Sequence, residues 1–183
     1  MSQSTLHATL RRATADAHSR VDAAVGGGIA DETGYARYLS GMHGFLACSH
    51  DALGPAWSLQ PLQALLLDDM EAMGVRPATG PGIEVAVAVD DITRLGWAYV
   101  VAGSSVGARQ LVRQAEALGS RAAPATAFLR RFAHSPMWPG VLSALEAARL
   151  DFPQTERLRE AALAAFATAE AAFQRAGDQS TDE

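Results

Sequence analysis

Apolar residues recur along this chain every three or four positions, which is the spacing of a buried helix face. In chain order, this pattern predicts helices over residues 4–25, 31–53, 61–73, 95–118, 124–132, 141–145 and 153–175. The one stretch that alternates, residues 84–89, has no second strand to pair with and is expected to be loop. The pattern therefore predicts an all-α fold, a single-domain helical bundle.

Residues that favour helix ends agree with several of these boundaries. Ser4 can cap the first helix, and the three glycines at 26–28 end it. Asp31 opens the second helix, where a carboxylate favours the positive end of the helix dipole. Gly54, followed by a proline, stops that helix.

The predicted helix over residues 95–118 carries a feature that needs a reason. Gly103 and Gly107 lie four apart on one face, with Ser104 and Ser105 between them. Each glycine inside a helix costs about 1 kcal/mol relative to alanine, so the pair costs about 2 kcal/mol. Either another helix packs closely on this small-residue face, or something flat lies against the backbone or the helix bends there.

Composition and charge narrow the class of protein. With 183 residues we expect one domain over residues 1–176 and a polar, frayed tail over 177–183. The net charge of −5 argues against general nucleic-acid binding. Cys48 is the only cysteine, which excludes a disulfide framework. No signal-peptide pattern and no apolar run near the roughly 20 residues of a membrane span occurs, so a cytoplasmic protein without membrane contact is expected.

His18 is the first candidate for chemistry. A histidine can bind a metal through Nε2 while Nδ1 is held from behind, and Asp22 lies one helical turn later for that purpose. Arg11 lies two turns earlier on nearly the same side of the helix. The alternative is a partly buried histidine that only makes a hydrogen bond.

Arginines are the candidate anion-binding residues, since their guanidinium pairs well with carboxylates. Arg109 and Arg113 lie one turn apart just beyond the glycines, although most such arginines are solvated surface residues. His43 and His50 are seven apart, whereas a two-ligand metal site on a helix uses a spacing of four. No glutamate has a histidine three residues later, which disfavours a di-iron carboxylate bundle.

Two segments, taken together, resemble a known family. The segment LRRATADAHSRVDA at residues 10–23 resembles the proximal helix of heme oxygenases, in which a Thr-x-x-x-His element supplies the axial iron ligand; here that element is Thr14 and His18. The segment AYVVAGSSVGARQL at residues 98–111 is similar to the distal helix, whose Gly-x-x-x-Gly element passes over the heme face. The second segment is most similar to the bacterial branch that supplies biliverdin to bacteriophytochromes, and residues 128–145 fit that branch more loosely.

The resemblance implies a heme-oxygenase-like bundle in which heme lies between the first helix and a glycine-kinked distal helix. His18 would ligate iron, Arg11 would meet a heme propionate, and Val106 with nearby alanines would suit an apolar ring. Heme would be both cofactor and substrate, cleaved with O2 to biliverdin with release of CO and Fe(II). Electrons would come from an external reductase or ferredoxin, and a bacteriophytochrome would be the acceptor of biliverdin.

Two departures from the family pattern keep other interpretations open. Many heme oxygenases have an aspartate directly after the first distal glycine, where this chain has Ser104. The segment WPGVLSAL, at residues 138–145, lacks the basic residues that many relatives offer to the second propionate, so that role falls to one of Arg109, Arg113, Arg130 or Arg131. The rival interpretations are a heme-binding or heme-carrying protein without turnover, and an unrelated bundle whose glycines serve only packing.

Overall fold

The structure, a computed structural model, describes residues 5–77, 90–119 and 121–179. Within these ranges the regular elements are helices and no strand occurs, so the predicted all-α fold is confirmed. The alternating stretch 84–89 and the proposed cap Ser4 lie outside the described residues. The elements are α1 (Leu6–Ala13), α2 (Ala15–Val25), α3 (Glu32–Leu53), the short 3₁₀ turn η1 (Pro55–Trp57), α4 (Gln60–Met73), α5 (Asp91–Ala117), α6 (Ala127–Ala133), α7 (Met137–Ala147) and α8 (Phe152–Gln179).

The first predicted helix is in fact two helices, α1 and α2, which meet at Thr14. The backbone of Thr14 leaves the helical region (φ −106°, ψ 4°), and its hydroxyl donates a 2.9 Å hydrogen bond to the Leu10 carbonyl. A threonine hydroxyl that bonds the preceding turn in this way bends or interrupts a helix. The prediction of one uninterrupted helix over residues 4–25 was therefore wrong, and Thr5, whose side chain accepts from the Ala8 amide, caps α1.

Two other helices begin at acidic caps, whereas the N-cap residues of α4, α6 and α7 make no side-chain cap. The Asp31 carboxylate accepts from the Gly34 amide at 2.7 Å and caps α3, and Asp90 caps α5 by accepting from the Thr93 amide at 2.8 Å. The last helix continues to Gln179, so the predicted tail starts later than residue 177.

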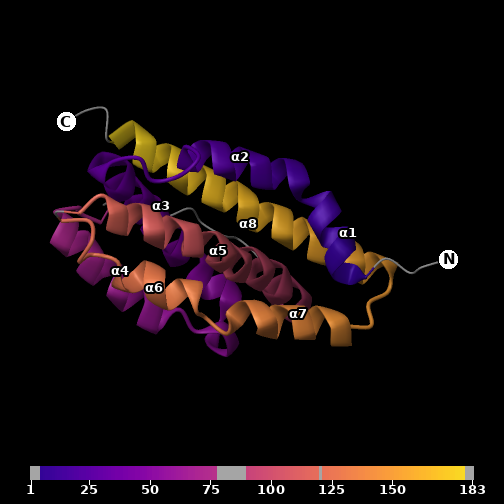
Figure 1. The fold of residues 1–183 in the computed structure, drawn as a ribbon. Helices are drawn as coiled ribbons and strands as arrows, with labels where there is room; N and C mark the ends of the chain where they lie inside the picture. The colour runs from indigo at the N-terminus through magenta and orange to yellow at the C-terminus, as the bar shows by residue number, and fades with distance from the viewer. Residues whose placement is uncertain (1–4, 78–89, 120, 180–183) are drawn as a thin grey trace.

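Helix α8 is a long helix against which other helices pack. It packs against α2, α3 and α5, and Figure 1 shows it running the length of the molecule beneath α2, with α4, α6 and α7 forming the opposite layer. Two glycines allow this close packing. A Cβ at Gly41 would collide with the Phe173 ring, and a Cβ at Gly96 would lie 2.6 Å from the Ala161 Cβ. Gly41 and Gly96 therefore let α3 and α5 lie close to α8.

A buried carboxylate joins α4 to α6. Asp69 is buried and accepts hydrogen bonds from the backbone amides of Ala127 (3.2 Å) and Phe128 (2.8 Å), so it caps α6 from another helix. Desolvation raises the pKa of Asp69, and the two amide hydrogen bonds oppose this rise. Nearby, the buried Tyr35 hydroxyl donates to the Ala125 carbonyl just before α6.

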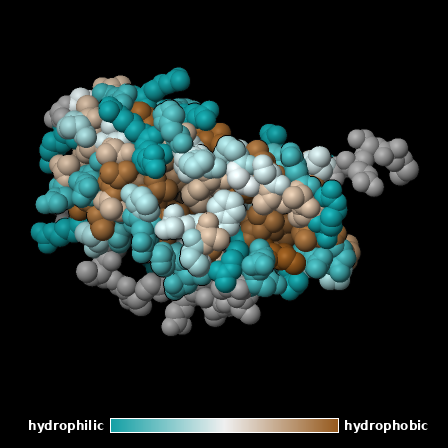
Figure 2. Space-filling view, turned by 90° about the horizontal axis from the view of Figure 1, so that it is seen from below, coloured by the Kyte–Doolittle hydropathy of each residue, from teal (hydrophilic) through white to brown (hydrophobic). Residues whose placement is uncertain are grey.

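The face of the molecule seen from below has both hydrophilic and hydrophobic areas (Figure 2). Seen from below (Figure 2), hydrophobic side chains gather in separate areas within a hydrophilic border. The large hydrophobic side chains exposed among the described residues are Leu67, Val106 and Phe152. No helix in the described part of the chain is long and apolar enough to cross a membrane.

Candidate functional site

A cleft of about 830 Å³ lies between the α1–α2 wall and α5, which is within the volume range of ligand-binding pockets. Helices α2 and α5 both pack on α8, so the two walls share one support. The α5 residues on the cleft run from Tyr99 to Leu111, which spans about 18 Å of helix. The floor is largely apolar and comes from α3 and α8: Tyr38, Met42, Phe45, Phe166, Ala169 and Phe173.

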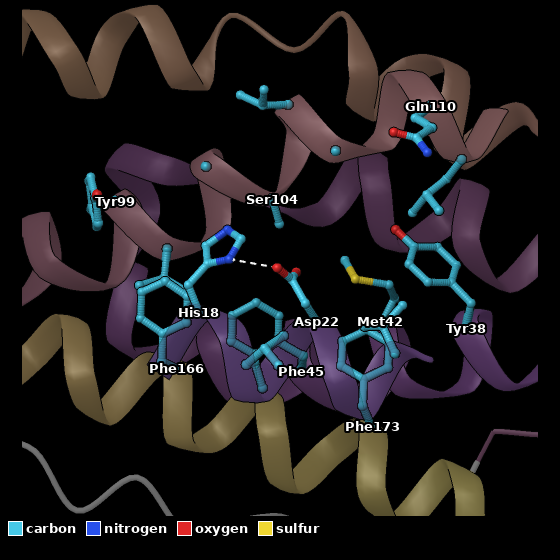
Figure 3. A pocket seen from close by; sticks show the side chains of 18 of the residues that line it. His18, Asp22, Tyr38, Met42, Phe45, Tyr99, Ser104, Gln110, Phe166 and Phe173 are labelled. Atoms are coloured by element: carbon cyan, nitrogen blue, oxygen red, sulfur yellow. Dashed lines mark hydrogen bonds and ion pairs between the residues drawn. The ribbon is translucent and has the colours of Figure 1, made fainter. Parts of the chain in front are cut away.

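His18 lies on the α2 wall of this cleft and is already oriented. Its Nδ1 forms a 2.9 Å hydrogen bond with Asp22 Oδ2, as predicted from the one-turn spacing (Figure 3). Because the carboxylate is the acceptor, Nδ1 is the donor, and in the neutral ring Nε2 then carries the lone pair. The His18 side chain is 64% exposed, so a ligand entering the cleft can reach it. The hydrogen bond expected by the alternative, a partly buried histidine, is present, but the side chain is more exposed than that alternative expects.

The two glycines of α5 line the cleft, and protein packing does not require either of them. A Cβ at Gly107 would meet no atom within 4 Å, and a Cβ at Gly103 would make only ordinary contact, 3.5 Å from the Trp138 ring. They differ in this from Gly41 and Gly96, which other helices press against. Close helix packing therefore explains Gly41 and Gly96 but not Gly107. Helix α5 runs without interruption through both cleft glycines, so the predicted kink is not confirmed.

The serines between the glycines are turned toward their own helix. The Ser104 hydroxyl donates to the Val101 carbonyl at 2.7 Å, and the Ser105 hydroxyl donates to the Ala102 carbonyl at 2.6 Å. Ser104 lines the cleft, whereas Ser105 is buried. With its proton used in this way, Ser104 presents oxygen lone pairs to the cleft, so it can accept a hydrogen bond there but does not donate one.

The structure brings Arg11 to the cleft but not the other predicted basic residues. Arg109 is not among the residues that line the cleft, and its Nε donates to the Ala133 carbonyl at 3.3 Å, at the end of α6. Arg113 is exposed and also lies off the cleft. Arg130 forms an exposed ion pair with Glu116 at 2.7 Å, and Arg131 is exposed on the same short helix. None of these four supplies a second anion partner within the cleft, which corrects the sequence-based assignment of Arg109 and Arg113.

Of two further residues predicted to contact a ligand, Val106 lines the cleft and Thr14 does not. Thr14 is buried and does not line the cleft; its side chain hydrogen-bonds that of Tyr99, a residue that does. Thr14 therefore does not line the cleft as predicted; it lies behind the cleft wall. Val106 lines the cleft and is 52% exposed, which places an apolar side chain on the cleft surface; its contact with a ring stays a prediction.

Sequence reasoning missed an aromatic cluster at one end of the cleft. His7 lies with its ring centroid 6.1 Å from that of Tyr99 and 5.7 Å from that of Trp138. Desolvation raises the pKa of Tyr99, while its bond to Thr14 and the charge of Arg11 oppose the rise. A signal was present in the sequence, since His7 precedes Arg11 by four residues and shares its helix face.

The described residues contain no group of three or more His, Cys, Asp or Glu side chains that could hold a metal ion by themselves. His43 and Cys48 are half-buried on α3, and burial lowers the pKa of His43. No protein-family model matches the chain, and no curated protein matches it significantly.

Proposed function

We propose that this protein binds heme in the cleft between α2 and α5 and cleaves it with O2 to biliverdin, CO and Fe(II). The observation that carries the proposal is the pairing of the two walls. A histidine held by Asp22 faces the cleft from α2, and Gly103 and Gly107 line it from α5 with no side chain of their own. One wall thus offers a ligand atom, and the other offers space.

The residues of the cleft fit a flat, mostly apolar ring. Phe45, Phe166 and Phe173 form much of its floor, and Val106 adds apolar surface on α5. A porphyrin supplies four of the iron ligands itself, so His18 would be the one protein ligand needed to hold the iron of a bound heme. The absence of a Cβ at Gly107 would leave space against α5 for a small molecule such as O2.

Asp22 is a positioning residue in this proposal. Its hydrogen bond to Nδ1 fixes the tautomer and the ring orientation of His18 and makes Nε2 a better donor to iron. Arg11 lines the same cleft and supplies a permanent positive charge for one carboxylate of the ligand. The oxidative chemistry belongs to the iron of the bound heme, with O2 and electrons from an external reductase or ferredoxin.

A second candidate function is a heme carrier that does not degrade its ligand. The observation that favours it is the hydroxyl of Ser104, whose proton is bonded to the Val101 carbonyl. A group that can only accept is a poor source of protons for oxygen chemistry. If the protein is an enzyme, a water molecule held by the Ser104 oxygen would have to supply the protons in place of the Ser104 hydroxyl. Release of biliverdin to a bacteriophytochrome belongs to the enzyme reading alone.

One cuvette experiment separates these functions. Purified protein is mixed with hemin in air, a ferredoxin–reductase system is added, and visible spectra are recorded over time. Decay of the Soret band with growth of the broad red absorption of biliverdin supports the enzyme, whereas a Soret band that persists after reduction supports the carrier. No Soret shift on adding hemin would refute both.

The role of His18 is tested by His18→Ala, with His50→Ala as the matched control because His50 is an exposed histidine on α3 outside the cleft. The proposal expects His18→Ala to lose the histidine-ligated spectrum and His50→Ala to keep it. Equal spectra and equal heme degradation in both variants would contradict the assigned role.

A further inference from the structure

The chain has three tyrosines, and the hydroxyl of one of them, Tyr38, faces the cleft (Figure 3). The Tyr35 hydroxyl, in contrast, donates to the Ala125 carbonyl outside the cleft. Among the described residues, the buried side-chain atom that lacks a hydrogen-bond partner is Trp97 Nε1 and not the Tyr38 hydroxyl, so the Tyr38 oxygen is accessible from the cleft. A tyrosine with a buried ring and an accessible hydroxyl can donate to a ligand that fills the cleft.

The surroundings of Tyr38 strengthen this conclusion. The residue is only 5% exposed and lines the cleft, with its ring centroid 5.9 Å from that of Phe173. Burial raises the pKa of Tyr38, so the hydroxyl keeps its proton at neutral pH and remains a donor. In Figure 3 its oxygen points away from the apolar floor of Met42 and Phe173, toward the side on which Gln110 lies.

Other contacts place Tyr38 and Gln110 at the same end of the cleft, far from Arg11. The Ile29 amide, just after α2, donates to Gln114 Oε1 at 3.0 Å, which ties the second half of α5 to this end. Next to Tyr38 in the chain, the Arg37 side chain lies beside Gly26 but does not line the cleft. Neither Tyr38 nor Gln110 carries a charge, and the cationic side chain that lines the cleft, Arg11, comes from α1.

An uncharged donor pair of this kind suits a neutral acceptor such as a carbonyl oxygen. The rim of heme carries methyl groups, vinyl groups and carboxylates, but no neutral carbonyl. Opening the ring creates one, because the terminal rings of a linear tetrapyrrole are lactams. On the basis of the proposed function, we infer that Tyr38 of α3, with Gln110 of α5 at the same end of the cleft, forms a subsite for a lactam carbonyl of the linear tetrapyrrole product.

This subsite gives the protein a means to distinguish product from substrate. Closed and opened tetrapyrroles share the apolar floor and the Arg11 contact, so these features bind both. The lactam carbonyl that Tyr38 would bond exists only in the opened form. The opened tetrapyrrole is therefore retained in the cleft after the ring is cleaved, until an acceptor takes it.

The test compares two ligands on the wild type and three variants. Hemin and biliverdin are titrated separately into the wild type, Tyr38→Phe, Tyr35→Phe and Gln110→Ala, and the dissociation constants are read from absorption or from quenching of tryptophan fluorescence. Tyr38→Phe should bind biliverdin about five- to tenfold more weakly, the value of one neutral hydrogen bond, and should bind hemin within about twofold of the wild type. Gln110→Ala should show the same selectivity with a smaller loss.

Tyr35→Phe is the matched control, because it removes a buried hydroxyl that already has a partner outside the cleft. It should lower the melting temperature and leave both ligand affinities unchanged, whereas Tyr38→Phe should leave the melting temperature of the ligand-free protein unchanged. Unaltered biliverdin binding in Tyr38→Phe, or an equal loss for both ligands, would overturn the inference. Failure of the wild type to bind hemin would instead overturn the proposed function.

Discussion

Substitution of Gly107 by alanine separates the two reasons for which a helix carries a glycine. If the glycine serves packing within the protein, an added methyl group collides and the fold loses stability. If it leaves space for a ligand, the fold gains stability and the ligand is bound less well. The structure predicts the second result, because a Cβ at Gly107 meets no atom within 4 Å and the residue lines the cleft.

The magnitude follows from helix propensity. Alanine is favoured over glycine in a helix interior by about 1 kcal/mol, and in a chain of this length that raises the melting temperature by about 2–4 °C. Gly96→Ala is the matched control on the same helix, since its Cβ would lie 2.6 Å from the Ala161 Cβ and 2.9 Å from the Leu158 carbonyl. Overpacking of this kind costs about 1–3 kcal/mol, so Gly96→Ala should be neutral to destabilising despite its better propensity.

The assay is thermal unfolding followed by far-UV circular dichroism, together with hemin titration of each folded variant. Gly107→Ala should melt higher than the wild type and bind hemin about tenfold more weakly, because the methyl group occupies ligand space. A lower melting temperature for Gly107→Ala would show that its side of α5 is packed against protein. Unchanged hemin affinity would show that the ligand does not approach this face.

Three further predictions concern charge. Asp22→Ala should weaken hemin binding about tenfold and alter the Soret band, because His18 loses its orienting partner; an unchanged spectrum would contradict this. Arg11→Ala should weaken hemin binding about tenfold, because Arg11 lines the cleft. Arg109→Ala should leave the hemin affinity within about twofold of the wild type, because Arg109 lies off the cleft. Equal losses of affinity in the two variants would contradict the assignment of Arg11 as the anion partner. Since the folded-state pKa of Asp69 is raised, its stabilising contribution is present at acidic pH and is lost as pH rises through that pKa. Urea unfolding should therefore show the stability of the wild type relative to Asp69→Asn growing as pH falls from 7 toward 4, and the opposite slope would refute this.

Local sequence signals were enough to predict most of the helices. The acidic cap at Asp90 and a regular apolar stripe define α5, and the same signals at Asp31 define α3. The break at Thr14 was missed because a threonine hydroxyl can either point to solvent or bond the preceding turn, and only the structure decides which. The cap on α6 was missed because Asp69 reaches it from 58 residues away in the chain.

The candidate site was predictable where one helix face defines it. His18 and Asp22 share a face of α2, so their hydrogen bond follows from spacing alone. Arg11 also lines the cleft, but it does so from α1, across the break at Thr14. Arg109 was misassigned because its direction depends on α6, whose end it bonds. The accessible hydroxyl of Tyr38 could not be predicted from the sequence. Whether it meets a protein group depends on how several helices pack around the cleft.

The interruption at Thr14 also makes α2 an element of its own. Helix α2 begins directly after that interruption, is followed by three consecutive glycines with positive φ, of 87°, 75° and 138°, and packs along α8. It is therefore a separate rod of about 16 Å whose position is fixed by its packing on α8. It carries both His18 and Asp22, so the histidine and the carboxylate that orients it belong to one rigid element. The direction in which His18 faces α5 thus depends on how α2 is seated on α8.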